Sequence, residues 1–230
     1  MTVLYEDNHL IFVNKQAGEI VQGDKTGDTP LSEIVKEWIK EKYNKPGNVY
    51  LGVVHRLDRP VSGVVLFAKT SKALPRLNNM FANHDKVRKT YWAIVQNKPE
   101  APKGRLTHWL TRNEKNNTAR AYDHEVAGSK KAILDYELIA SSDRYHLLQI
   151  HLHTGRHHQI RCQLAKMGCP IKGDLKYGAP RSNPDGSISL HARHLTIEHP
   201  VSHEQISITA PVPNDSLWQE ISKRANNYKT

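Results

Sequence analysis

Two consecutive runs of alternating apolar and polar residues, at residues 132–140 and 144–153, place the strongest constraint on the fold. Alternation with a period of two is typical of a β-strand that has one buried face and one solvated face. The three residues between the runs, Ser141-Ser142-Asp143, are typical of a turn. An antiparallel hairpin is therefore predicted in the second half of the chain.

Strand and helix patterns are mixed irregularly along the rest of the chain. Short β-prone runs predict strands at Val3–Tyr5, Leu10–Val13, Leu51–Val54, Val64–Ala68, Lys86–Gln96, Leu195–Ile197 and Ile206–Ile208. Helical spacing predicts helices after Thr29-Pro30, after a Ser71 cap, from His157 to an end at Gly168, and after an Asn214 cap. Because strands and helices do not strictly alternate, the pattern favours an α+β fold with a mixed, mainly antiparallel sheet and flanking helices.

The net charge of +10 is concentrated in one segment. Residues 69–131 hold 14 Lys and Arg against 5 Asp and Glu, whereas residues 1–68 hold 8 against 9 and residues 132–230 hold 11 against 9. A local excess of positive charge attracts polyanions through phosphate contacts and counterion release. The distribution therefore indicates a nucleic acid partner, with a solubilising surface as the alternative.

The two cysteines and the hydropathy of the chain bear on its compartment. Cys162 and Cys169 form no paired C-x-x-C motif, and no signal peptide is recognisable. Both are expected to be free thiols in the reducing cytoplasm. No run of about 18 apolar residues occurs, so no membrane span is expected.

The most informative stretch is a polar loop between two predicted strands, His55-Arg56-Leu57-Asp58-Arg59-Pro60-Val61-Ser62-Gly63. Loops held by buried strands commonly carry chemistry. The two arginines and the histidine favour the ionised form of Asp58, which makes this carboxylate a candidate nucleophile or base. The structural alternative is an ion pair at the end of a strand.

This loop and the strand after it resemble the signature of the RluA-type pseudouridine synthases, which reads His-Arg-Leu-Asp, a Ser-Gly pair and an apolar strand ending in Ala-Lys. Other segments are similar to family elements in the same order: Asn14-Lys15-Gln16-Ala17-Gly18, with Gln16 where proline is usual; Arg88-Lys89-Thr90-Tyr91; Thr154-Gly155-Arg156-His157-His158-Gln159-Ile160-Arg161, followed by Gly173-Asp174 and Tyr177-Gly178; and Leu190-His191-Ala192-Arg193-His194-Leu195 with His199-Pro200. Together the segments extend from about Val3 to Pro211.

The resemblance implies the pseudouridine synthase fold, with a central catalytic cleft, and an RNA uridine isomerase with Asp58 as its essential carboxylate. It also implies that Tyr91 packs against the target uracil and that Arg161 pairs with Asp58, since a guanidinium can hold a carboxylate bidentately. By strand pattern alone, Tyr91 is an ordinary half-buried aromatic residue. We expect residues 1–230 to form a single catalytic domain without an accessory RNA-binding domain at the N-terminus.

The expected partner is a structured RNA, ribosomal or transfer, and the expected contacts are His55, Arg56, Arg59, Arg156 and Gln159. Arg156 is expected to meet a phosphate near a helix start. A uridine inside a stacked helix must be flipped out, at a cost of a few kcal/mol. The resemblance assigns to Arg56 the filling of the gap, because its flat cation can stack where a base was.

The reaction requires neither a metal nor an organic cofactor. Pseudouridine formation breaks the bond between uracil N1 and ribose C1′ and rejoins the base through C5 without a redox change. Asp58 can either attack covalently or abstract a ribose proton, and the sequence does not choose between these roles.

Two other functions fit parts of the sequence. Fourteen histidines suggest a metal-dependent hydrolase, although they lack a matching set of Cys or carboxylate ligands at a recognised spacing. The histidines in question are His151, His153, His157, His158, His191 and His194. An RNA-binding or chaperone-like module without catalysis would keep the basic segment, but Asp58, Tyr91 and Arg161 are all present. A monomer without an obligate protein partner is the default expectation.

Overall fold

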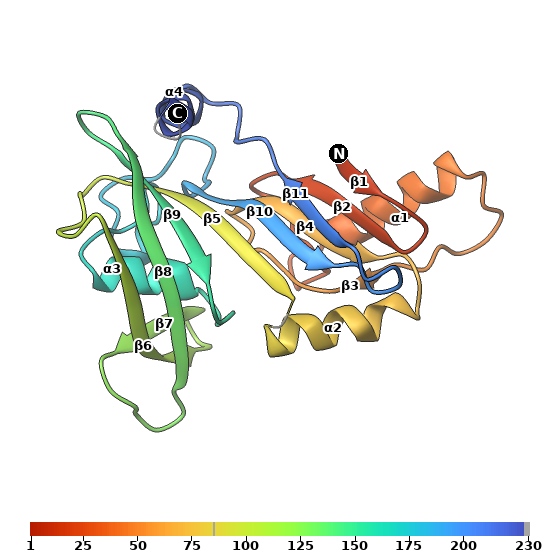
Figure 1. The fold of residues 1–230 in the computed structure, drawn as a ribbon, viewed down its shortest axis with the longest axis horizontal. Coiled ribbons are helices and arrows are strands. Elements are labelled where there is room, and N and C mark those ends of the chain that lie inside the picture. The colour runs from red at the N-terminus through yellow and green to blue at the C-terminus, as the bar shows by residue number, and fades with distance from the viewer. Residues whose placement is uncertain (85, 228–230) are drawn as a thin grey trace. The chain divides into compact units, whose positions relative to one another are not determined.

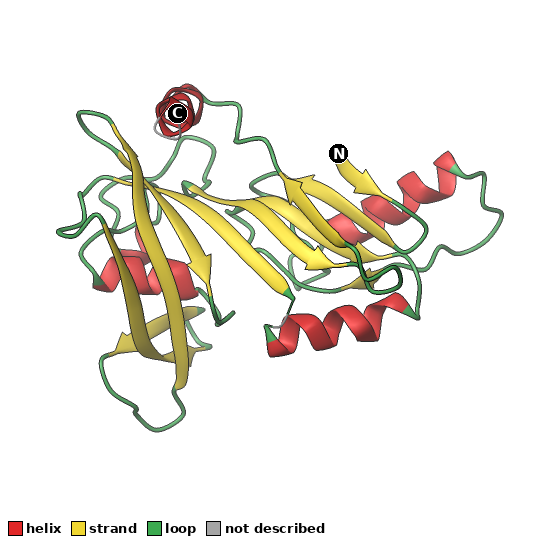
Figure 2. Cartoon of the chain, in the orientation of Figure 1, coloured by secondary structure: helices red, strands yellow, loops and turns green. Residues whose placement is uncertain are grey.

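The computed structural model describes residues 1–84 and 86–227, which divide into two compact units (Figure 1). Unit 1 comprises Met1–Arg88 and Ala192–Pro211, and unit 2 comprises Lys89–His191 and the chain from Val212 onward. Both units combine strands with helices, as the colours in Figure 2 show. The prediction of an α+β fold with a mainly antiparallel sheet is confirmed.

Unit 1 is built around paired strands at both ends of its sequence. Its strands are β1 (Thr2–Glu6), β2 (Leu10–Lys15), β3 (Gly52–Val53), β4 (Ser62–Ala68), β10 (Leu190–Glu198, assigned to this unit from Ala192) and β11 (Gln205–Thr209). The predicted hairpin is formed by β1 and β2, and β2 pairs antiparallel with β4, so that Lys15 lies opposite Gly63. In the sheet order β10 follows β4, and β11 pairs with β10.

Two helices, α1 (Leu31–Lys42) and α2 (Ala73–Asn83), belong to unit 1. Both show the predicted apolar stripe, and Leu77 and Phe81 of α2 share a buried cluster with Phe12 of β2 and Leu66 of β4. Burial of this stripe, rather than helix propensity, supplies most of the stability of such short helices.

Gly63 at the start of β4 occupies a position that only glycine fits. Its φ is +119°, a region that side-chain-bearing residues rarely adopt, and an added Cβ would collide with the backbone of Ala192 in β10. The close approach of the Gly63 and Ala192 backbones therefore depends on the last residue of the polar loop.

Unit 2 contains five antiparallel strands in the order β5-β9-β8-β6-β7. These are β5 (Val87–Val95, assigned to this unit from Lys89), β6 (Lys103–Asn113), β7 (Thr118–Tyr122), β8 (Lys130–Ser141) and β9 (His146–Leu152), with the helices α3 (Gln159–Lys166), the short η1 (Leu175–Tyr177) and α4 (Ser216–Asn227). The strongest prediction, the hairpin in the second half of the chain, is confirmed as β8 and β9.

Different helices cover different parts of the sheet of unit 2. Cys162 of α3 lies in a buried cluster with Leu110 and Ala132, whereas Trp218 and Ile221 of α4 share a buried cluster with residues of β5, β8 and β9. Each helix therefore has its own apolar contact with the sheet.

Three helix starts differ from the expectation. The hydroxyl of Thr70, not that of Ser71, accepts a hydrogen bond from the first N–H of α2, and Asp215, not Asn214, caps α4 by accepting from the N–H of Trp218. The third helix begins at Gln159 rather than at His157, because His158 has a φ of 50° and interrupts the helical backbone.

The strands β6 and β7 are absent from the sequence-based expectation. Their alternation is hard to recognise because a polar residue, His108, occupies one of the two buried positions of β6. Its ring lies 2.9 Å from the amide nitrogen of Gln163, which compensates for the burial.

The expectation that Cys162 and Cys169 are free thiols is confirmed, and both are buried. Burial raises the pKa of Cys162 to about 11, so the thiol is inert at neutral pH. Among the described residues, no helix combines the length and the apolar character that a bilayer crossing requires.

Candidate active site

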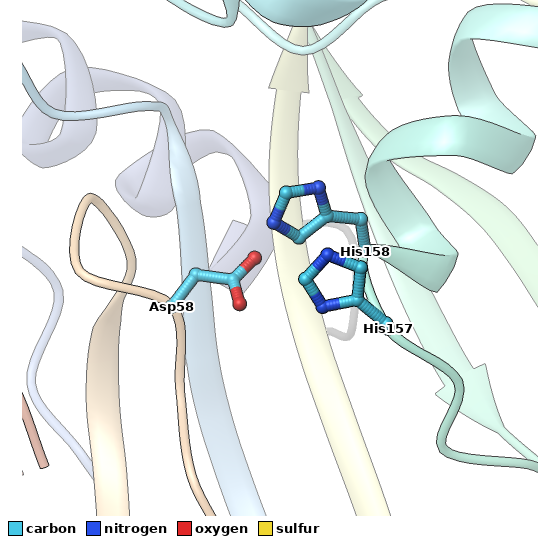
Figure 3. A group of neighbouring side chains, drawn as sticks. All are labelled: Asp58, His157 and His158. Atoms are coloured by element: carbon cyan, nitrogen blue, oxygen red, sulfur yellow. The ribbon is translucent and has the colours of Figure 1, made fainter. Parts of the chain in front are cut away.

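Asp58 lies on a tightly anchored turn between β3 and β4 of unit 1 (Figure 3). Its neighbours Leu57 and Val61 are buried, with 7% and 2% exposure, and the N–H of Val61 donates to the main-chain oxygen of Asp58 at 3.0 Å. Asp58 itself is only half-buried. The fold therefore fixes the backbone on both sides of a carboxylate that solvent can still reach.

A buried lysine binds the main chain of this turn. Lys15 has no exposed surface, and its Nζ lies 2.6 Å, 3.1 Å and 3.3 Å from the main-chain oxygens of Val61, Arg59 and Asp58. A fourth oxygen, that of Gln16, lies at 3.1 Å. An ammonium has three N–H donors, so the four carbonyls share them.

Two opposing effects act on the pKa of Lys15. Burial lowers the pKa of Lys15 to about 8, while the negative charges of Glu19 and Asp58 act to raise it. Sequence reasoning used Lys15 only as part of a motif and missed this role. The available signal was a lysine directly after the run Leu10–Asn14, whose first four residues are apolar.

The basic residues that flank Asp58 in sequence have different bonding partners. His55 accepts a hydrogen bond at Nε2 from the N–H of Leu66, at 3.0 Å, which leaves the ring proton on Nδ1. Arg59 donates to Asp28 at 2.7 Å, in a pair that is partly exposed. His55 and Arg59 thus stabilise the loop, whereas Arg56 is exposed to solvent. Their contacts with RNA stay predictions.

Arg161 is the central charged residue of a buried cluster in unit 2. Its Nε and Nη2 donate to the two carboxylate oxygens of Asp174 at 2.7 Å and 2.8 Å, and Nη1 lies 3.0 Å from Nε2 of His158. The side chains of Arg161 and Asp174 are only 6% and 1% exposed. The bond to Asp174 engages two of the five N–H donors of the guanidinium. The expected pairing with Asp58 stays a prediction.

Gln159 has a structural position at the turn before α3. Its amide oxygen accepts from the hydroxyl of Thr154 at 2.8 Å and from the N–H of Arg156 at 3.0 Å, and its amide nitrogen donates to Ile133 at 3.1 Å. Arg156 is exposed, although its Nε donates to the main-chain oxygen of Lys131. The guanidinium of Arg156 is thus accessible to a phosphate, whereas the bonded amide of Gln159 orders the backbone.

Tyr91 lies on β5 opposite Ile150 of β9 and is 9% exposed. Because side chains alternate along a strand, its ring lies on the other face of the sheet from Thr90 and Trp92. A rigid, largely buried ring is suited to supporting a planar base, and this role stays a prediction.

The histidines of the metal-hydrolase alternative are mostly engaged in hydrogen bonds. Figure 3 shows the rings of His157 and His158 one against the other, with centroids 3.8 Å apart. Both ring nitrogens of His158, of His151 and of His194 lie within hydrogen-bond distance of protein atoms. A histidine binds a metal through the lone pair of a ring nitrogen. A ring nitrogen in one of these hydrogen bonds either already uses its lone pair as an acceptor or carries a proton instead.

Comparison with known proteins identifies similar sequences over most of the chain. A model of the family described as RNA pseudouridylate synthase matches residues 9–166. An uncharacterized RNA pseudouridine synthase of Chlorobaculum parvum is 34% identical over 237 residues, covering 94% of this chain and 72% of the relative. Ribosomal large subunit pseudouridine synthase D of Zymomonas mobilis is 30% identical over 225 residues, covering 94% and 70%. The tRNA pseudouridine synthase C of Yersinia pestis is 30% identical over 237 residues, covering 95% and 88%.

A solved structure shares the fold. The human RNA pseudouridylate synthase domain containing 4 superimposes with a TM-score of 0.79 at 21% sequence identity, covering 98% of this chain and 93% of that chain. The predicted fold is confirmed by this likeness.

Proposed function

From the premise that the chain belongs to the RNA pseudouridylate synthase family and is an RNA uridine isomerase, we propose that Asp58 is the carboxylate that carries out the isomerisation. The observation that supports this role is the turn of Asp58, anchored by two buried apolar residues and by the Lys15 ammonium. A nucleophile must be held in a fixed direction but remain accessible to its substrate, and a half-buried carboxylate on a fixed backbone meets both requirements.

The chemistry requires one carboxylate and no electron transfer. The bond between N1 and C1′ breaks, the base turns, and a bond from C5 to C1′ forms. C5 then gives up its proton and N1 takes one up, so the product is an isomer of the substrate. Asp58 acts either by adding to the substrate or by removing a ribose proton. Tyr91 supports the uracil ring, and Arg161 pairs with the Asp58 carboxylate.

The substrate is a folded RNA whose target uridine is flipped out of its stack. The concentration of positive charge in residues 69–131 supports binding to phosphates, and the exposed side chains of Arg56 and Arg156 supply planar cations for stacking and phosphate contact. Two of the relatives are named for ribosomal large subunit RNA and for tRNA. We therefore propose one of these two RNA classes as the substrate of a monomeric, cytoplasmic enzyme that works without a cofactor.

Pseudouridine mapping of total RNA from cells that lack this protein tests the proposal. The cells are complemented with the wild type or with Asp58→Ala. Discrete sites that disappear and return only with the wild type would establish both the activity and the target RNA. A map that is unchanged in cells without the protein, together with an inactive purified enzyme on the same RNA, would favour an RNA-binding module instead.

A further inference from the structure

A continuous chain of hydrogen bonds lies behind Arg161 in unit 2. Asp174 accepts two bonds from Arg161, Arg161 reaches Nε2 of His158 at 3.0 Å, and Nδ1 of His158 reaches the hydroxyl of Tyr177 at 2.8 Å. The hydroxyl oxygen of Tyr177 in turn accepts from the N–H of Ala119 in β7, at 2.7 Å. This series of hydrogen bonds thus joins α3, the short helix η1 and a strand of the sheet.

The chemistry of these partners determines the protonation state of His158. A guanidinium has only donors, so Nε2 of His158 must carry a lone pair and accept from Arg161. An imidazole keeps at least one ring proton at neutral pH, and since Nε2 carries the lone pair, this proton must be on Nδ1. The Nδ1–H donates to the Tyr177 hydroxyl. His158 is therefore a neutral ring with its proton on Nδ1.

Tyr177 holds a fixed protonation state within this series of hydrogen bonds. Burial raises the pKa of Tyr177 to about 12, so the phenol stays protonated and does not compete for the proton of His158. Its ring also lies under the guanidinium of Arg161, with 5.1 Å between Cζ and the ring centroid. Tyr177 thus touches Arg161 directly through its ring and indirectly through His158.

Together, these contacts restrict the guanidinium of Arg161 at Nε, Nη1 and Nη2 and on one face. Asp174 fixes the edge formed by Nε and Nη2, His158 fixes Nη1, and the ring of Tyr177 covers one face. Preorganised donors stabilise charge more effectively than mobile ones, because they need not reorient during the reaction.

We propose that His158, Asp174 and Tyr177 are positioning residues that hold Arg161 for the isomerisation, with His158 acting as a neutral acceptor. The inference rests on the proposed function, in which Arg161 pairs with the catalytic carboxylate. None of the three positioning residues needs to touch the substrate or transfer a proton to it.

Two substitutions at His158 separate its two bonds. In His158→Gln the amide oxygen can reach the site of Nε2 and accept from Arg161, whereas in His158→Asn the shorter amide reaches only the site of Nδ1 and can donate to Tyr177. We expect His158→Asn to lower kcat about tenfold or more with little change in KM, and His158→Gln to stay within about threefold of the wild type. The exposed His124 provides the matched control, since both substitutions there should leave kcat unchanged.

The kinetic result distinguishes positioning from plain structural support. Thermal unfolding of both variants is measured in parallel, so that a general loss of folding is recognised. An equal loss of kcat in the two variants, or retention of kcat in His158→Asn, would overturn the inference.

Nitrogen-15 NMR of the histidine rings tests the protonation state without any reaction. We expect the wild type at neutral pH to show a neutral His158 ring protonated at Nδ1, and a ring protonated at Nε2 or at both nitrogens would overturn the inference. A wild type that forms no pseudouridine would instead sink the proposed function. An active wild type with the wrong tautomer would sink only the positioning role of His158.

Discussion

The buried ammonium of Lys15 lies 3.3 Å from the main-chain oxygen of Asp58 and 2.6 Å from that of Val61, the residue that closes the same turn. Four carbonyl oxygens converge on this one nitrogen. Carbonyls that point at one another repel unless a donor lies between them. The conformation of the turn that carries Asp58 therefore depends on a residue 43 positions earlier in the chain.

Replacing Lys15 by Met should loosen this turn. The methionine keeps most of the side-chain volume but leaves the carbonyls without their donor, so we expect the free energy of unfolding to fall by about 1–3 kcal/mol. The value of kcat should fall more than KM rises, since the backbone of Asp58 loses its direction. Urea unfolding and steady-state kinetics measure both effects. Lys25→Met, at an exposed position of the same unit, should leave both unchanged; equal behaviour of the two variants would contradict the role of Lys15.

The same lysine predicts a pH dependence of stability. Burial lowers the pKa of Lys15 from 10.5 to about 8 in the folded protein. Between about pH 8 and pH 10.5 the unfolded chain binds this proton and the folded chain does not, so the contribution of Lys15 to the free energy of unfolding rises with pH. The difference in unfolding free energy between the wild type and Lys15→Met should increase over this window. A difference that decreases would mean that the four carbonyls keep the ammonium charged.

Asp58→Asn should abolish turnover without unfolding the protein. The amide is neither a nucleophile nor a base, and we expect the rate to fall by at least about 10²-fold. Because Asp58 is half-buried and its turn is held through main-chain atoms, the melting temperature should change little. Tritium release from RNA that carries 5-tritiated uridine reports the reaction, and a filter-binding assay reports affinity. Turnover close to that of the wild type would remove Asp58 from the chemistry.

Arg56→Ala should lower activity and the distortion of the RNA together. The exposed guanidinium is proposed to stack in the space that the flipped uridine leaves, so its removal should slow turnover and weaken the fluorescence change of a 2-aminopurine next to the target. Arg144→Ala removes an exposed arginine from the turn between β8 and β9 and serves as the control. Unchanged turnover of Arg56→Ala would sink the base-flipping role.

Asp174→Asn should be strongly destabilising. The substitution removes the buried carboxylate charge that pairs with the guanidinium of Arg161, and breaking a buried ion pair typically costs about 3–5 kcal/mol. The double variant Arg161→Met with Asp174→Leu should be more stable than Asp174→Asn, because it removes both charges, but it should be inactive. Chemical denaturation of the three proteins provides the test. A single variant that is as stable as the wild type would show that the pair contributes little.

The sequence by itself determined the elements whose pattern is local. The alternation at residues 132–140 and 144–153 predicted the hairpin of β8 and β9, and the apolar spacing after Thr29-Pro30 predicted α1, because a buried face imposes its period on neighbouring residues. The motif around Asp58 identified the candidate loop, since its residues are consecutive.

Only the tertiary structure decided where the polar side chains find their partners. The residues that flank Asp58 in sequence have different bonding partners: His55 bonds to the backbone of Leu66, and Arg59 pairs with Asp28. Conversely, the position of Lys15 indicated burial but not its partners, and the bond between Arg161 and Asp174 gave no local signal. A buried charge must be satisfied wherever an acceptor lies, and the chain separation between the two partners leaves no period in the sequence.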